Sequence, residues 1–287
     1  MPEITAAGHN PLQKYFRQPK LYITLPSGGQ FYPQGALEIT ETGEFPVFSM
    51  TAKDELAFKT PDALLNGQAT VDVIQSCIPN IKNAWMMPSI DIDAALVAIR
   101  MATYGEMLTI TTKVPVIGEE REFQVDLRIL LDQFANQQFE QVIHAGELTV
   151  HLRPLTYQEF TKSAIKTFEE QRIFNLVNNE EVSDEDKLQA FTNSFSKLTE
   201  LTVSMVTQGI EKIVIGEDEV SNRQHIDEFV KNSDKDFFKR ITDHLENQKK
   251  KYSIKPLAVN SSPEDQKQGV PANYEIPITF DQSNFFG

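Results

Sequence analysis

The chain has a single cysteine, Cys77, among its 287 residues, so no internal disulfide can form. This usage fits a protein that folds in a reducing cytoplasm better than a secreted protein. The first twenty residues lack the apolar core of a signal peptide. No apolar run approaches the ~18 residues that a membrane span requires. We therefore expect neither export nor membrane insertion.

Basic residues are also scarce, with 27 Lys and Arg against 41 Asp and Glu and a formal net charge of −14. A general nucleic-acid-binding protein needs a Lys/Arg surface that displaces counterions from phosphates. Anionic lipid likewise attracts basic segments. The charge therefore predicts no nucleic-acid partner and no membrane, and it favours a basic protein partner.

Known catalytic and nucleotide-binding patterns are missing as well. The five histidines stand too far apart for a metal motif. Gly28-Gly29 is followed by Gln30, Phe31 and Tyr32, where a P-loop would place Lys and Ser or Thr. This stretch, "LPSGGQFYP", therefore predicts a turn.

One pair of carboxylates, Asp91 and Asp93, could hold Mg²⁺ together with a substrate phosphate. The pair lies in the first turn of a predicted helix, where carboxylates satisfy free amides and the helix dipole. We therefore predict no enzyme, no cofactor and no metal. A metal-dependent hydrolase at Asp91 and Asp93 is the weaker alternative.

Local patterns in the first half predict strands and helices together. The best helix is residues 89–105, where apolar residues recur at helical spacing before Gly105. Its expected buried face consists of Ile92, Ala95, Leu96, Ile99 and either Ala102 or Thr103. Strands are predicted at 21–25, 36–40, 46–50, 107–114, 121–127 and 147–154.

The second half is rich in helix starts. Thr156 and Glu159 form a capping box that predicts a helix to about residue 176. Residues 183–186 head a longer helix. After a short strand or turn at 212–216, two more helices begin near Ser221 and Ser233. An apolar face of the longer helix is indicated by Leu188, Phe191, Phe195, Leu198 and Met205.

These patterns together predict an α+β fold with a mixed α/β N-terminal domain, an all-helical C-terminal domain and extended arms at both ends. The expected boundaries are 1–20 for the N-terminal arm, 21–153 for the mixed domain, 154–252 for the helical domain and 253–287 for an extended C-terminal docking tail.

The C-terminal tail combines two compositions. Prolines and polar residues make its middle a linker. Its end alternates as a strand and is aromatic, which favours a peptide that adds to a partner's sheet edge or fills a groove. The alternative is that it packs back on its own domain. The predicted partner-binding residues are Tyr274, Ile276, Ile278, Phe280, Phe285 and Phe286.

Three stretches in this order resemble a family of baseplate hub proteins from contractile-tailed, T4-like bacteriophages, which are implicated in hub assembly. They are "LPSGGQFYPQGALEIT", "TAKDELAFKTPDALLNGQATVDVIQSCIPNI" and "DIDAALVAIRMATYGEMLTITTKVP". The recurring elements are a turn (Leu25, Pro26, Ser27, Gly28, Tyr32), the acidic segment from Lys53 to Glu55, and a helix end with Arg100, Tyr104 and Gly105. The resemblance covers most of residues 20–175.

The resemblance implies a non-enzymatic structural or assembly protein of the phage tail. Its partners would be other tail and baseplate proteins, with multiple copies in a larger assembly as an option. It would act in the host cytoplasm during assembly and in the virion tail if retained. The alternative is a dissociable assembly chaperone that leaves before the virion is finished. Phe31 and Tyr32 would face a neighbour, or else belong to the core.

One segment departs from the family pattern. Where many such proteins carry a Cys-Pro-x-Cys knuckle, this chain has Val114-Pro115-Val116-Ile117. A zinc site needs thiolates or imidazoles, so this loop cannot hold the metal. We expect apolar packing of Val114 and Ile117 to hold it instead.

Overall fold

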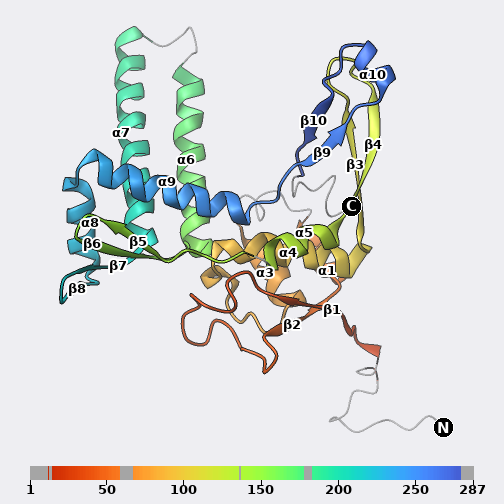
Figure 1. The fold of residues 1–287 in the computed structure, drawn as a ribbon, viewed down its shortest axis with the longest axis horizontal. Helices are drawn as coiled ribbons and strands as arrows, with labels where there is room; N and C mark the ends of the chain where they lie inside the picture. The colour runs from red at the N-terminus through yellow and green to blue at the C-terminus, as the bar shows by residue number, and fades with distance from the viewer. Residues whose placement is uncertain (1–11, 13–14, 59–66, 136, 178–182, 279–287) are drawn as a thin grey trace.

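The computed structural model of the chain describes residues 12, 15–58, 67–135, 137–177 and 183–278 (Figure 1). Within these residues, helices and strands alternate along the whole chain. The first half contains β1 (Pro19–Thr24), β2 (Glu44–Phe48), α1 (Ala52–Phe58), α3 (Gln68–Cys77), η2 (Ala84–Met86), α4 (Ser89–Tyr104), β3 (Met107–Lys113), β4 (Glu120–Asp126) and α5 (Leu127–Ala135). The second half contains β5 (Val142–Ala145), β6 (Leu148–Leu152), α6 (Tyr157–Val177), α7 (Asp184–Gly209), β7 (Ile210–Ile215), β8 (Asp218–Val220), α8 (Arg223–Asn232), α9 (Lys235–Tyr252), β9 (Leu257–Asn260), α10 (Pro263–Lys267) and β10 (Asn273–Ile276).

The predicted fold class, a mixed domain followed by an all-helical domain, is wrong. β7 and β8 follow α7 and complete an antiparallel sheet in the order β5-β6-β7-β8. In that sheet Val150 of β6 stands opposite Ile213 of β7. A short strand must find hydrogen-bond partners for its backbone, and β7 finds them in a strand that precedes two long helices. The predicted domain boundaries stay a prediction.

The predicted extended C-terminal arm is also wrong for residues 257–276, which fold as a hairpin. β9 and β10 pair antiparallel, with Leu257 opposite Ile276. Between them α10 begins with a capping box, in which the Ser262 hydroxyl accepts from the Asp265 N–H and the Asp265 carboxylate accepts from the Ser262 N–H. Pro263 occupies the first helical turn, where its missing N–H costs nothing. The proline that suggested a linker therefore starts a helix.

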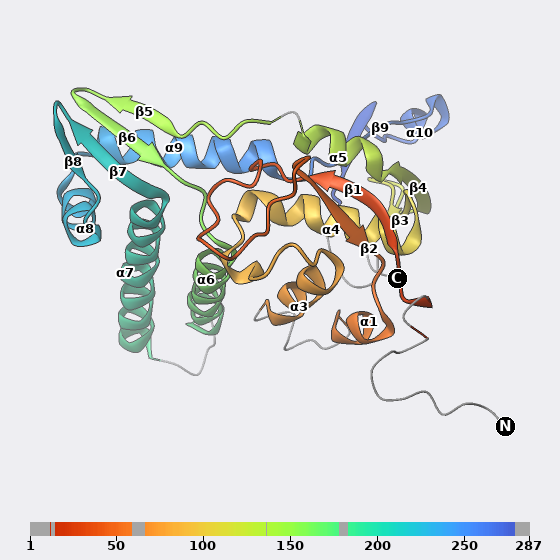
Figure 2. The same cartoon turned by 90° about the horizontal axis from the view of Figure 1, so that it is seen from below.

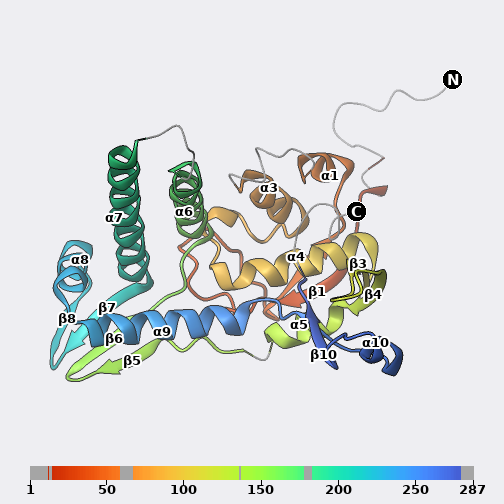
Figure 3. The ribbon, with the colours of Figure 1, turned by 90° about the horizontal axis from the view of Figure 1, so that it is seen from above.

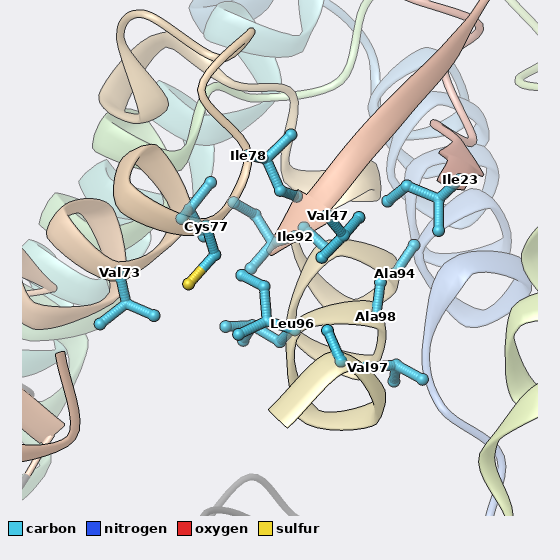
Figure 4. Close-up of a cluster of buried hydrophobic side chains, with 14 of the residues drawn as sticks. Ile23, Val47, Val73, Cys77, Ile78, Ile92, Ala94, Leu96, Val97 and Ala98 are labelled. Carbon is cyan, nitrogen blue, oxygen red and sulfur yellow. The ribbon is translucent and has the colours of Figure 1, made fainter. Parts of the chain in front are cut away.

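The larger core surrounds α4. Ten of its sixteen residues are buried, from Ile90 through Ala102, so the helix is enclosed on nearly every side instead of presenting one apolar face. Its side chains lie between those of α3 and those of the β1–β2 pair, as the close-up shows (Figure 4). α9 and α6 also pack against it. The arrangement around α4 can be followed from below (Figure 2).

A second core lies under the four-stranded sheet. Val150, Leu152 and Ile213 of the sheet are buried against helices α8 and α9. Both helices begin at side-chain caps, where Asn222 accepts from the Gln224 N–H at 2.8 Å and Asp234 accepts from the Phe237 N–H at 2.7 Å. Helices α8 and α9 thus cover one face of the sheet, and β5 and β8 are its edge strands.

Two hairpins stand near opposite ends of the longest axis and rise on the same side of the body in Figure 1; Figure 3 shows their separation along that axis. One is the antiparallel pair α6 and α7. The other combines β3–β4 with β9–α10–β10, joined where both terminal nitrogens of Arg121 donate to Asp265 at 2.7 Å. Phe123 and Tyr274 add an edge-to-face contact with ring centroids 6.5 Å apart. Within the described residues, every helix is too short or too polar to span a bilayer.

Candidate functional site

A fully buried carboxylate, Asp91, anchors the "LPSGGQFYP" turn to α4. The Ser27 N–H donates to Asp91 Oδ1 at 2.7 Å, and the Ser27 hydroxyl donates to Oδ2 at 2.6 Å. The Tyr32 hydroxyl donates to Oδ2 at 3.0 Å. Gly28 and Gly29 have φ angles of 64° and 80°, which confirms the predicted turn. Asp91 therefore accepts hydrogen bonds from a turn that lies 64 residues earlier in the chain, and it does not cap the start of its own helix.

The electrostatics of this anchor follow from its burial. Burial raises the pKa of Asp91 to about 6, and the hydrogen bonds from Ser27 and Tyr32 oppose that rise. Burial, and then the neighbouring Asp91 charge, raise the pKa of the Tyr32 phenol far above its usual range. Tyr32 therefore remains a donor at every physiological pH.

Asp93 does not share this site. Two residues along a helix correspond to a rotation of about 200°, and Asp93 accepts instead from the backbone N–H of Ile254. Burial raises its pKa to about 6, offset by that bond and by Lys249. The structure therefore does not bring Asp91 and Asp93 together. Among the described residues, no group of three or more His, Cys, Asp or Glu side chains could hold a metal ion.

Asp93 lines an apolar groove of about 440 Å³ between the two cores. The walls come from the start of α4, the start of α6, the end of α7 and the C-terminal part of α9. Lys249 lies 5.8 Å from the centre of the Phe160 ring at one side of the groove. The floor includes Ile92 and Val206, both buried.

The two turn aromatics predicted to face a neighbour lie against the chain itself. Phe31 is half-buried at φ 67°, and its ring meets Phe139 edge-on with centroids 5.5 Å apart. Tyr32 packs against the larger core. Binding of a partner by these two residues stays a prediction.

The predicted tail anchors divide into two groups. Ile276 is 3% exposed in the larger core, and Tyr274 and Ile278 pack against that core while half-buried. These three residues stabilise the chain's own fold. Phe280, Phe285 and Phe286 lie outside the described residues, and their role in binding stays a prediction.

Arg100, Tyr104 and Gly105 stabilise the C-terminal end of α4. The Arg100 guanidinium lies 4.6 Å from the centre of the Tyr104 ring, a cation–π contact. Gly105 has φ 92°, and its N–H donates to the Met101 carbonyl at 3.0 Å. The glycine permits a backbone conformation that L-residues rarely adopt.

The loop that lacks the cysteine knuckle joins β3 to β4. Val114 is 1% exposed and Ile117 is half-buried, as expected for an apolar loop. The Val114 N–H donates to the Glu119 carbonyl and the Gly118 N–H to the Val114 carbonyl, both at 2.9 Å. Val116 has φ 69° and is 72% exposed at the tip of the hairpin.

Four apolar residues are exposed on the α6–α7 hairpin, and we name this surface the α6–α7 stripe. It consists of Phe168 on α6 and Leu188, Phe191 and Phe195 on α7, all exposed. Of the apolar α7 face expected from helical spacing, Leu198 and Met205 are half-buried, whereas the three stripe residues of α7 are exposed. Ser194 is 2% exposed, and no sequence signal distinguishes it from the polar residues of α7 that face solvent.

Comparison with known families gives one match. A family model described as T4 bacteriophage base plate protein matches residues 19–262. The match runs from β1 through β9 and ends before α10. No curated protein and no solved structure matches the chain.

Proposed function

The chain belongs to the T4 bacteriophage base plate protein family, and from this membership we propose a structural protein of the baseplate hub that acts by protein–protein binding. It performs no catalysis in this role. Its partners are other proteins of a contractile phage tail. It is made in the host cytoplasm and retained in the tail of the virion.

The observation that carries this proposal is the family match over residues 19–262. The anchor at Asp91 supports it against the hydrolase alternative. That carboxylate has no exposed surface and already accepts three hydrogen bonds from the turn. A carboxylate so enclosed has no access to a substrate. Its three hydrogen bonds instead hold the turn against α4.

The chain's two projecting hairpins also support a binding role, because they offer surfaces that are separated along the long axis of the body (Figure 1). The net charge of −14 favours partners with basic surfaces. The phenylalanines of the last nine residues are suited as anchors, since large rigid side chains dominate interface energies.

Capture of baseplate proteins from a phage-infected lysate tests the proposal. Tagged full-length chain should retain at least one baseplate protein, identified by mass spectrometry. In a full-length variant, Phe280, Phe285 and Phe286 are changed to alanine. The amount of captured baseplate protein should fall at least about 10-fold, because hot-spot aromatics each contribute about 2 kcal/mol or more. The triple change of Gln282, Ser283 and Asn284 to alanine is the matched control in the same segment.

Equal capture by all three proteins would show that the last nine residues are not the binding element, while the baseplate role would stand. No capture by any of them would contradict the binding role itself. Truncation at residue 278 serves as a second form of the test, since it removes the same aromatics and leaves the hairpin of residues 257–276 in place.

The alternative within the same family is an assembly chaperone that leaves before the particle is complete. It would use the same surfaces and differs only in its absence from finished tails. The composition of purified particles separates the two roles.

A further inference from the structure

The groove between the two cores contains two polar groups that the described part of the chain leaves short of partners. Asp93 of α4 accepts from the Ile254 N–H, and Lys249 acts on it through charge alone. Tyr252 of α9 lines the same groove and is 3% exposed. Its hydroxyl has no hydrogen-bond partner among the described residues. Buried polar groups are almost always hydrogen-bonded, so these two groups favour a ligand that brings them a partner.

The rest of the groove is mainly apolar, with a volume of about 440 Å³. A volume of this order accommodates one large side chain together with its flanking residues. The apolar lining includes Ile92, Phe160, Met205, Val206 and Leu245. Glu246 and Lys249 are exposed whereas Tyr252 is buried, so the groove runs from a charged rim to a buried polar group.

The cations around the groove are mostly matched by carboxylates. Arg153 binds Glu159 at 2.7 Å, and Lys251 binds Glu140. Each of these two cations is therefore neutralised by one carboxylate. Lys249 is the other cation of the lining, and it forms no ion pair with the residues that the structure describes.

The carboxylates outnumber the cation that remains. Asp93 and Glu246 line the groove, and the buried Asp91 lies near enough for its charge to act on Tyr252. Burial, and then the charges of Asp91 and Glu140, raise the pKa of the Tyr252 phenol to about 12. The buried end of the groove therefore has a negative potential, which favours a cationic donor.

From these observations we infer that the groove binds an arginine side chain that a partner protein presents between apolar residues. A guanidinium carries several donors in a fixed plane, so it can donate to the Asp93 carboxylate and to the Tyr252 oxygen at once. Its aliphatic stem lies along the apolar walls while the head reaches the two polar groups. A neutral or acidic segment would leave Asp93 without a cation, and a second copy of this chain brings a net charge of −14. The charges therefore favour a basic partner.

Titration of a synthetic peptide into the methyl-labelled full-length chain tests the inference by nuclear magnetic resonance. The probe is acetyl-Leu-Arg-Leu-amide, and we expect saturable shifts at the methyl groups of Ile92 and Met205, which line the groove. The same peptide with citrulline in place of arginine keeps the shape and loses the charge. It should bind at least about 10-fold more weakly, because charge-assisted hydrogen bonds are about twice as strong as neutral ones.

Three variants assign the binding to the two polar groups. Asp93→Asn keeps an acceptor for the Ile254 N–H and should weaken binding of the arginine peptide at least about 10-fold. Glu228→Gln removes the same charge from an exposed residue of α8 and should leave binding unchanged. Tyr252→Phe should weaken binding about 3-fold or more. Its urea midpoint should equal or exceed that of the native chain, because the change breaks no hydrogen bond within the described fold.

Equal affinity for the arginine and citrulline peptides would overturn the inference. So would shifts confined to methyl groups outside the groove, or no saturable shift at millimolar peptide. A lower urea midpoint of Tyr252→Phe with unchanged affinity would also contradict it, because the hydroxyl would then be bonded within the fold. The probe is a synthetic peptide, so none of these results bears on the proposed hub role.

Discussion

Replacement of Asp91 by alanine should destabilise the protein by about 3–5 kcal/mol, since loss of one partner from a buried charged network leaves its donors unpaired. The Ser27 N–H and the Ser27 and Tyr32 hydroxyls would lose their acceptor. Urea denaturation followed by circular dichroism measures the change. Asp218→Ala, at an exposed position of β8, is the control and should shift stability by less than about 0.5 kcal/mol. An equally small effect of Asp91→Ala would mean that the anchor is not structural.

The raised pKa of Asp91 predicts that the free energy of unfolding depends on pH. Its pKa is about 6 in the fold against an ordinary value of 3.8, so the folded state binds its proton more tightly. The contribution of protonated Asp91 to the free energy of unfolding is fully present below pH 3.8, and it is lost as the pH rises through about 6. The stability of the native chain relative to Asp91→Asn should therefore fall across this window, by at most about 3 kcal/mol. A flat difference between pH 4 and 7 would contradict the raised pKa.

A chain ending at Lys251 should lose cooperative folding of the larger core, whereas a chain ending at Ile278 should keep it. Ile276 is 3% exposed in that core, and Leu257, Val259 and Tyr274 pack against it from the same hairpin. Burial of large apolar side chains contributes about 1.5–3 kcal/mol each, so their loss approaches the total stability of about 5–15 kcal/mol of a typical domain.

The two truncations are compared by urea denaturation and by near-ultraviolet circular dichroism. Ile276→Ala in the full chain, expected to cost about 2–5 kcal/mol, tests the same packing without removing residues. Glu275→Ala, at the neighbouring exposed position, is its control. A stable, cooperative chain ending at Lys251 would show that the hairpin is an accessory and not part of the core.

Sequence patterns located the elements whose signals are local. The helix predicted at 89–105 corresponds to α4, and the capping box of Thr156 and Glu159 is formed at the start of α6. β3 and β4 fall where alternation indicated strands. In each of these cases the residues that decide the structure are neighbours in the chain.

The misses share a dependence on distant residues. A short strand or turn was expected at 212–216, but its place in a sheet depends on β6, which pairs with β7 across two helices. Asp91 finds its donors 64 residues away, and no local rule distinguishes that role from a helix cap. The hairpin of residues 257–276 was hidden by prolines and polar residues, because its apolar side chains gain stability from a core that forms elsewhere.

The α6–α7 stripe shows a different limit. Helical periodicity at Leu188, Phe191 and Phe195 identified an apolar face, but it could not say whether the chain covers that face itself. The answer depends on which neighbour packs against the helix, and here Ser194 is buried whereas Leu188, Phe191 and Phe195 are exposed. Periodicity therefore locates an apolar face, and the tertiary structure decides which of its residues are covered.

The central claim is a structural role in the phage baseplate, and the protein composition of purified tails tests it most directly. Quantitative mass spectrometry of finished particles should detect this chain in a fixed ratio to other baseplate proteins. Its absence from finished particles, together with abundance in the infected cell, would contradict retention in the virion and favour the dissociable chaperone.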